Sequence, residues 1–350
     1  MTPKTGSFSC PVPKLIHSHV LLGHGSGGKL MHDLIENVFR PLLLGESAEP
    51  LNDAALLESN GIRIALTTDS FVVDPIFFPG GDIGALAVHG TINDLAVSGA
   101  RPIALSAAFI LEEGFAMDEL CRVVTSMHEA SARAGVPILT GDTKVVQRGK
   151  CDRVYINTTG IGHLITDQPL SVDRARPGDL ILLNGDIATH GIAILMAREE
   201  LELDVPVESD TAPLHTLVKT ILESRPPIRC MRDPTRGGLA SALNEIATAS
   251  GVGIRIYEDR IPIRDEVRGA CELLGLDPLQ VANEGKLIAV VARDAAEAVL
   301  EQMRAHPLGR QAAIIGEVVD DHHNMVVMRT HVGGYRVVDM LAGEQLPRIC

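Results

Sequence analysis

The sequence predicts two α/β domains in one chain of 350 residues. With 45% apolar residues, a chain of this length is too long to fold around one hydrophobic core of ordinary size. Short β-branched or apolar runs alternate with amphipathic helical segments along the whole chain. A turn signal at Arg176–Asp179 precedes the apolar strand expected at Leu180–Leu183. We therefore divide the chain into an extension (1–19), an N-terminal ATP-binding domain (20–168), a C-terminal domain (169–342) and a tail (343–350).

The first domain alternates strands with two helices. One helix is expected from Ile83 to Ser98 after an N-cap at Asp82, and another from Met117 to Ala134 before Gly135. The expected strands are His19–Leu22, Arg63–Thr68, Ile103–Ile110, Pro137–Leu139 and Val154–Gly160.

The second domain repeats this alternation. Helices are expected near residues 190–200, 211–224, 237–250, 265–275 and 294–306, and strands at Ile254–Tyr257, Leu287–Ala292, Ala313–Val319 and Met325–Arg329. Beyond Leu341, Gly343 and Pro347 prevent a helix from continuing, and the apolar content is too low for firm docking. We expect the last residues to form a mobile tail.

Composition excludes several classes of partner. A net charge of -14, no Trp and only three Tyr disfavour nucleic acid. No apolar run reaches the roughly 18 residues that a membrane span needs. The six cysteines form no pair at metal-ligand spacing, so we expect a reduced protein in the cytoplasm. Carboxylates that hold divalent cations still allow an acidic protein to bind a polyphosphate.

A glycine-rich loop at Gly23–Lys29 precedes an apolar helix. It is not a Walker A loop, because Leu30 stands where the magnesium-binding hydroxyl belongs. It is not a Rossmann fingerprint either, because no second strand ending in an acidic residue follows about 20 residues later. Two interpretations remain open, a structural turn or a loop that wraps phosphate with backbone N–H groups. In the second, the phosphate-binding residues are Gly25, Gly27 and Gly28.

Acidic motifs recur in the first domain. Asp94, next to Asn93, interrupts an otherwise apolar helix, where an unpaired carboxylate is costly unless a cation meets it. Any single aspartate at a strand end is commonly a cap or an Asx-turn. Several that converge at one end of a sheet instead favour Mg²⁺ and ATP. The candidate metal ligands are Asp53, Asp69, Asp94 and Asp142, and Asn93 joins them as a candidate nucleotide ligand. Lys144 closely follows Asp142.

Three further features lie in the second half. Asp233 belongs to a charged, glycine-containing segment, Arg232–Leu239, which is either an anion site before a helix or a capped loop. Glu284 precedes a buried strand and is either a base or a turn residue. Cys350 ends the sequence and is either a carrier thiol on a flexible arm or an incidental surface thiol. Its α-carboxylate raises the thiol pKa, so reactivity needs cationic help from Arg348 or from a partner's active site.

Together, the glycine loop, the aspartate motifs, the Arg232–Gly238 segment and the terminal Pro-Arg-Ile-Cys closely resemble the HypE family of hydrogenase maturation proteins over residues 20–350. This family is similar to aminoimidazole ribonucleotide synthetase and thiamine-monophosphate kinase. The resemblance implies a two-domain fold of that type, with an N-terminal sheet that forms a barrel-like interface in a homodimer. It also implies that Asp53, Asp69, Asp94 and Asp142 hold magnesium and phosphates.

The resemblance implies an activity as well. HypE-type proteins receive a carbamoyl group on the terminal cysteine from the carbamoyltransferase HypF and dehydrate it to a thiocyanate with ATP. The cyanide then passes to iron on the HypC–HypD complex. On this hypothesis Cys350 carries the substrate, Glu284 is the base and Lys144 polarises the amide oxygen. The alternatives are another ATP-dependent enzyme of the superfamily, including a selenophosphate synthetase that uses Cys10, or a scaffold without catalysis.

Overall fold

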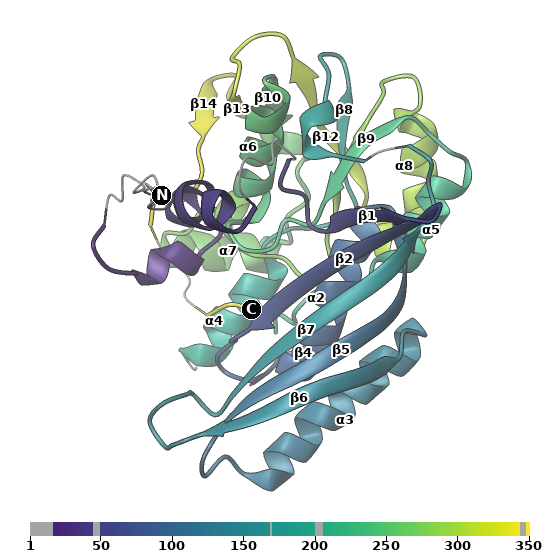
Figure 1. Cartoon of the computed structure of the whole chain (residues 1–350). Helices are drawn as coiled ribbons and strands as arrows, with labels where there is room; N and C mark the ends of the chain where they lie inside the picture. The colour runs from purple at the N-terminus through teal and green to yellow at the C-terminus, as the bar shows by residue number, and fades with distance from the viewer. Residues whose placement is uncertain (1–16, 45–49, 169, 200–205, 344–347) are drawn as a thin grey trace, which may run out of the picture.

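The structure is a computed structural model that describes residues 17–44, 50–168, 170–199, 206–343 and 348–350. Its two domains each centre on a mixed β-sheet, and the C-terminus lies where they meet (Figure 1). None of the helices within these ranges combines the length and the apolar character that crossing a bilayer requires.

The N-terminal domain contains a five-stranded sheet in the order β1-β2-β7-β5-β6. Only β5 and β6 run parallel. A small hairpin, β3 (Phe77–Phe78) and β4 (Gly81–Asp82), leads into the first long helix. Among the described residues the sheet stays open and closes no barrel. Its strands are β1 Ala55–Ser59, β2 Ile62–Phe71, β5 Ala100–Glu112, β6 Ile138–Val146 and β7 Val154–Leu164.

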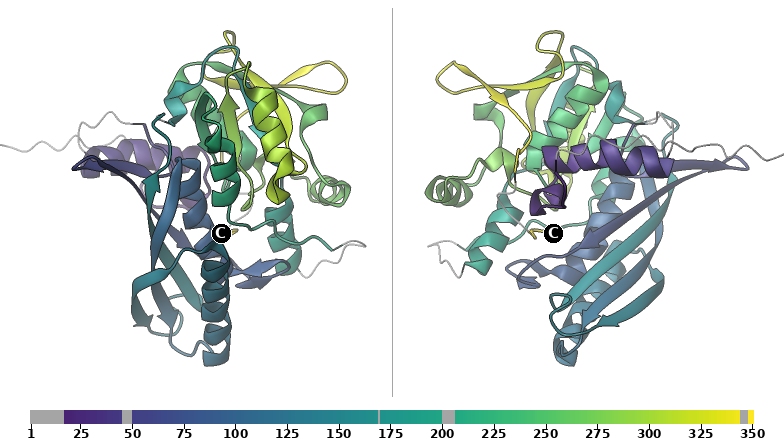
Figure 2. Two further views of the ribbon diagram at one scale, coloured as in Figure 1. Left: turned by 90° about the vertical axis from the view of Figure 1, so that its right-hand side faces the viewer. Right: turned by 60° about the vertical axis from the view of Figure 1, so that its left-hand side comes forward.

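Helices α2 (Ile83–Val97) and α3 (Met117–Ala134) cover one face of this sheet (Figure 1). The predicted N-cap is confirmed, since the Asp82 carboxylate accepts from the backbone N–H groups of Gly84 and Ala85. Nearly every residue of α2 is buried, because the helix lies between the sheet and the second domain. The opposite face of the sheet carries no described helix, as Figure 2 shows.

The C-terminal domain contains a seven-stranded sheet in the order β14-β13-β10-β12-β8-β11-β9 with helices on both faces. Ile181 and Leu183 of β8 pack towards α6, and Leu182 packs towards α5 and α8. The strands are β8 Leu180–Leu183, β9 Ile228–Arg232, β10 Gly253–Tyr257, β11 Ile288–Val291, β12 Ala313–Val319, β13 Met325–Arg329 and β14 Tyr335–Val338. The helices are α4 Thr189–Arg198, α5 His215–Glu223, α6 Gly238–Ser250, α7 Asp265–Leu274 and α8 Ala296–Ala305.

Two predictions about the ends of the chain are wrong. The strand expected at His19–Leu22 is absent, and a short 3₁₀ turn at Leu22–Gly25 stands there, because the exposed segment has no strand to pair with. The helix after the glycine loop is present, as α1 (Lys29–Leu34) followed by a π-helical stretch at Ile35–Leu44.

The tail is docked at its end, contrary to the prediction. Residues 344–347 lie outside the described residues, but the last three, Arg348–Cys350, pack against both domains. Ile349 is 3% exposed and joins the core of the N-terminal domain. The segment has little apolar area, and hydrogen bonds from the backbone and from arginine side chains hold it instead. Composition alone does not reveal such hydrogen bonds.

Core packing on α2 sets the stability of the N-terminal domain. Leu86 is fully buried there, so we expect Leu86→Ala to lower the free energy of unfolding by about 2–5 kcal/mol. Urea denaturation followed by circular dichroism measures this change. Leu273→Ala is the matched control, since that leucine is 78% exposed and its loss should change stability by less than about 0.5 kcal/mol. Equal effects of the two substitutions would contradict this packing.

Candidate active site

An acidic cluster lies between the two domains. Carboxylate oxygens of Asp53, Asp94 and Asp233 all lie within 4.8 Å of one another. Asp53 comes from the loop before β1, Asp94 from the last turn of α2, and Asp233 directly follows β9. Asp69, near the end of β2, lies close enough to Asp94 for each carboxyl group to shift the pKa of the other. Three of the four predicted aspartates therefore meet, joined by Asp233 from the second domain.

Burial makes this cluster a poor place for negative charge. Desolvation raises the pKa of Asp53 to about 6 and that of Asp69 above its ordinary value. The pKa values of Asp94 and Asp233 rise well above 3.8 because burial and the neighbouring carboxylates both disfavour ionisation. A cation placed among these oxygens would reverse both effects.

The cluster fits a divalent metal ion. Arg232 neutralises one member, with Nε 3.2 Å from an Asp53 oxygen, and it also pairs with Glu245. Asp94 accepts a hydrogen bond from the Thr67 hydroxyl at 2.7 Å. One buried oxygen of Asp233 has no hydrogen-bond partner among the described residues. Carboxylate oxygens are the hard ligands that Mg²⁺ prefers, and here several lie close together, one of them without a hydrogen-bond partner among the described residues.

The glycine loop is held against the second domain beside this cluster. Gly27 has a φ of +74°, and a Cβ there would lie 2.4 Å from the carbonyl oxygen of Arg236. A Cβ on Gly28 would lie 2.2 Å from the carbonyl oxygen of Leu341. The Arg236 guanidinium donates to the carbonyl of Gly25 at 3.2 Å. Only glycine permits this close approach. The loop forms one wall of a cavity of about 840 Å³, which Asp53 and Arg232 also line.

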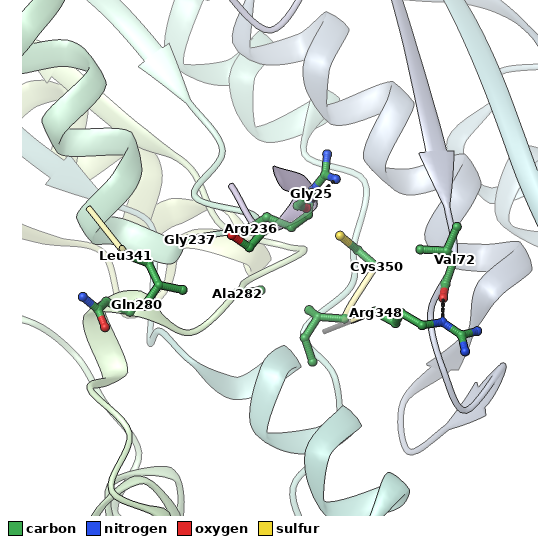
Figure 3. Close-up of a pocket in the computed structure, with 11 residues that line it drawn as sticks. Gly25, Val72, Arg236, Gly237, Gln280, Ala282, Leu341, Arg348 and Cys350 are labelled. Carbon is green, nitrogen blue, oxygen red and sulfur yellow. Dashed lines mark hydrogen bonds between the residues drawn. The ribbon is translucent and has the colours of Figure 1, made fainter. Parts of the chain in front are cut away.

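The terminal thiol lies on the other side of the glycine loop. Figure 3 shows the Cys350 sulfur directed towards Arg236, in a cavity of about 50 Å³ that Gly25 and Ala282 also line. Desolvation raises the pKa of the thiol to about 12, although Arg236 opposes the rise. In turn, Cys350 and the buried carboxylates raise the pKa of Arg236. The thiol therefore stays protonated in this position, and Arg236, not Arg348, is the cation beside it.

Glu284 belongs to the same buried group. It is 3% exposed, and burial together with Asp233 and Asp210 raises its pKa well above 4.5. Asp210 accepts from the Glu284 backbone N–H at 3.1 Å and lies 3.0 Å from the Lys286 ammonium. Burial alone would raise the pKa of Asp210, but the Lys286 ammonium and the Glu284 backbone N–H bring it below its ordinary value. A charged Asp210 thus positions the peptide of a neutral Glu284.

Asn93 bridges the domains. Its amide donates to the carbonyls of Ala212 and Glu284 at 3.1 and 3.0 Å, and its oxygen accepts from the Leu214 N–H at 2.7 Å. The structure therefore places this residue as a support of Glu284 inside the protein.

Asp142 and Lys144 lie apart from the cluster on edge strand β6. Asp69 is paired with Thr158, whose hydroxyl donates to α2, so both face the helices. Asp142 aligns through β5 with Asn157, the preceding residue of β7, and therefore faces the open side of the sheet. Lys144 shares that face and lies 2.6 Å from an Asp142 oxygen, and both side chains are about two-thirds exposed. Within one chain these two residues cannot join the site.

Sequence reasoning missed the exposed Arg236 and three buried side chains, Asp210, Lys286 and His190. Arg236 belongs to the charged Arg232–Leu239 segment, but nothing in the sequence indicates that the C-terminal tail lies beside it. Asp210 stands in an irregular stretch before α5, where its pairing with Lys286 depends on tertiary structure.

Comparison with known proteins agrees with this arrangement. The sequence matches the AIR synthase related protein family, N-terminal domain over residues 51–164 and C-terminal domain over residues 176–329. The carbamoyl dehydratase HypE of Azotobacter vinelandii is 56% identical over 336 residues, which cover 96% of this chain and 98% of that relative. The chain belongs to the HypE family.

Solved HypE structures share the fold. A HypE in complex with ATP is 50% identical with a TM-score of 0.80, over 95% of this chain and 100% of that chain. A HypE–HypF complex gives 50% identity and a TM-score of 0.84, over 88% of this chain and 99% of that chain. The predicted HypE resemblance and the two-domain α/β architecture are confirmed.

The raised pKa of Asp94 predicts how stability depends on pH. A carboxyl whose pKa is raised on folding binds more protons in the native state, so stability falls as the pH rises above 3.8, the ordinary value. Asp94→Asn removes this cost. Without cations or nucleotide, we expect the variant to be more stable than the wild type by about 2 kcal/mol at pH 8, with the difference vanishing near pH 4.

Thermal unfolding across this pH range measures the effect, and Mg²⁺ provides the second test. Added Mg²⁺ should raise the melting temperature of the wild type more than that of the variant, because one ligand is missing. Asp118→Asn, in the first turn of α3, is the control and should show neither effect. If Asp94→Asn destabilised the protein at pH 8, the carboxyl would be serving as a satisfied structural group.

Proposed function

We propose that the protein dehydrates an S-carbamoyl group on Cys350 to a thiocyanate with ATP and so supplies the cyanide ligands of the iron centre in NiFe hydrogenases. The observation that carries this proposal is the docking of Cys350 in one cavity with Arg236, close enough to Glu284, Asp69 and Asp233 for their charges to act on the thiol. Membership of the HypE family supports the reaction, since relatives at 56% and 54% identity are carbamoyl dehydratases.

The buried residues around the tail suit the proton transfers of a dehydration. Two protons must leave the amide nitrogen as the carbon–nitrogen triple bond forms. Glu284, with its pKa raised by burial, is a stronger base than an ordinary glutamate once it is ionised. Arg236 stabilises negative charge beside the sulfur-bound group. Asn93 and Asp210 hold the Glu284 backbone in place.

ATP and Mg²⁺ are the cofactors that we assign to the cavity between the glycine loop and the second domain. When bound, they supply a phosphoryl group that makes the amide oxygen a leaving group. Gly25 is exposed and Gly27 and Gly28 line the cavity, so we assign the phosphates to this loop, and the acidic cluster supplies the metal ligands Asp53, Asp69 and Asp94, with Asp233 added. A related HypE binds ATP, which supports this assignment.

The remaining proposals concern partners and domains. HypF supplies the carbamoyl group, as the solved HypE–HypF complex suggests, and the HypC–HypD complex accepts the cyanide. We place the protein in the reducing cytoplasm, since the five cysteines within the described residues are unpaired. The family matches at 51–164 and 176–329 support domains at 20–168 and 169–342, with an extension at 1–19 and a carrier tail at 343–350.

In a homodimer, Asp142 and Lys144 would contribute to the active site of the partner chain. The helix-free face of the N-terminal sheet exposes apolar side chains, among them Leu57, Ile110 and Ile161 at 53%, 44% and 40%. Apposition of two such faces buries these residues and forms the barrel-like interface. We propose that each chain then offers Asp142 and Lys144 to its partner's site, where Lys144 polarises the amide oxygen and Asp142 adds a metal or phosphate contact.

Mass spectrometry of the C-terminal peptide tests the reaction. After carbamoylation by HypF, Mg²⁺ and ATP should remove the mass of one water from the Cys350 peptide. Cys350→Ala should carry no adduct. Glu284→Gln should keep the adduct and lose water at least about 100-fold more slowly, because the base is gone. An adduct of unchanged mass in the wild type would reject the mechanism.

Mixed dimers test the shared site. Lys144→Ala and Cys350→Ala proteins should each be inactive as homodimers. Coexpression should restore about a quarter of wild-type activity, since half of the dimers are mixed and each contains one intact site. The measurement is ATP-dependent water loss on the Cys350 peptide of the Lys144→Ala chain. If Lys144 acts on its own chain, no mixture of the two variants recovers any activity.

A further inference from the structure

Arg232 lies among carboxylates of both domains at the edge of the acidic cluster. It is the last residue of β9, directly before Asp233, and its side chain reaches the loop that precedes β1. Nε lies 3.2 Å from an Asp53 oxygen. One terminal nitrogen pairs with Glu245 of α6, and the other donates to the Leu51 carbonyl at 3.3 Å. The guanidinium therefore occupies a position beside Asp53, one of the ligands assigned to the metal ion.

The contact of Arg232 with Asp53 differs from its contact with Glu245. Its Nε is buried and makes no hydrogen bond within the described ranges, so the approach to Asp53 is a charge contact without hydrogen-bond alignment. The contact with Glu245 is a hydrogen bond between charged groups, which is the stronger kind. Burial opposes the charge of Arg232, but Asp53 and Glu245 raise its pKa above the ordinary value. Arg232 is therefore positively charged and can leave Asp53 while it keeps Glu245.

The position of Asp53 does not depend on this arginine. The side chain of the preceding residue, Asn52, accepts from the Val172 N–H at 3.0 Å and donates to the Ser171 hydroxyl at 3.2 Å. These two hydrogen bonds fix the loop to the segment that joins the domains. What Arg232 supplies to the Asp53 carboxylate is therefore charge, which a metal ion could supply in its place.

We propose that Arg232 is a resident counter-ion, whose guanidinium takes the place of a metal ion beside Asp53 and is displaced towards Glu245 when a divalent cation binds there. The guanidinium and the cation compete, because the same carboxylates attract both and each repels the other. Arg232, Asp53 and Glu245 line one cavity of about 840 Å³, which leaves room for this movement. The inference rests on the proposed function, which assigns Mg²⁺ to the acidic cluster.

This competition makes the empty cluster a poor site for a free cation. Displacement of Arg232 then has to be compensated by the carboxylates alone. Phosphate oxygens of a nucleotide in the same cavity would add ligands and negative charge, and so favour the cation over the arginine. Arg232 therefore couples occupancy of the cluster to the presence of nucleotide. It acts through Asp53, as a positioning residue.

Binding of Mn²⁺ to the full-length protein without nucleotide tests the competition. Mn²⁺ prefers the same oxygen ligands as Mg²⁺, and electron paramagnetic resonance measures the concentration of the free ion. At pH 8 we expect Arg232→Met to bind Mn²⁺ about tenfold more tightly than the wild type, because the repelling charge is gone. Arg232→Lys keeps that charge and should remain within about threefold of the wild type.

Arg255→Met is the matched control. Arg255 also lies between two carboxylates, 3.6 Å from Glu317 and 3.0 Å from Asp321, and its side chain is 24% exposed. It belongs to β10, outside the cavity that Arg232 lines. Its loss changes the net charge of the protein by the same amount, so the affinity for Mn²⁺ should stay that of the wild type.

Thermal unfolding separates a counter-ion from a structural arginine. Without metal, Arg232→Met should melt at a lower temperature than the wild type, because Asp53 and Glu245 lose their counter-charge. Saturating Mg²⁺ should recover most of this loss, since the variant binds the cation more tightly. An arginine needed only for packing would cause the same loss with and without Mg²⁺.

Asp94→Asn, measured in parallel, distinguishes failure of the competition from failure of the metal assignment. If Asp94→Asn weakens Mn²⁺ binding while Arg232→Met leaves it unchanged or weaker, the metal site stands and the counter-ion is overturned. Mn²⁺ binding that does not depend on Asp94 would reject both. These measurements use neither ATP nor a carbamoyl donor, so their outcome is independent of the dehydration itself.

Discussion

Burial of carboxyl groups that have too few positive partners is the constraint on which the rest of this site depends. Asp53, Asp94 and Asp233 lie within 4.8 Å of one another between the two domains, with Arg232 as the charge that directly pairs with one of them. Such a cluster is stable in its protonated form or around a cation, and it is costly otherwise. The same burial keeps Glu284 neutral and the Cys350 thiol protonated. A divalent cation bound among these carboxylates would therefore remove the cost of ionising them.

The sequence predicted the parts of this site that local chemistry determines. Asp94 could be identified because a carboxylate in an apolar helix requires a partner, and the structure places it in the cluster. The glycine loop was recognised by its residues, although no strand precedes it. Helices with clear caps, such as α2 and α3, were predicted to within a residue or two. Short strands such as β9 and β14 gave no distinct pattern and were missed.

The sequence could not reveal which face of a sheet a side chain occupies, or which residues from distant parts of the chain lie close together. Asp142 lies in the same kind of motif as Asp69, yet the pleat of the sheet directs the two side chains to opposite faces. Only the register across β7 and β5 reveals this. The docked tail escaped prediction for a related reason, since its binding depends on Val72, Asp152 and His190, which come from separate elements. A composition that is too polar for hydrophobic docking is fully compatible with docking by hydrogen bonds.

The environment of Cys350 also has a bearing on chemical damage. Peroxides and stray electrophiles attack the thiolate, and a thiol with a pKa of about 12 supplies almost none of it. While Cys350 lies between the domains, its thiol is therefore largely protected from oxidation and from reaction with electrophiles.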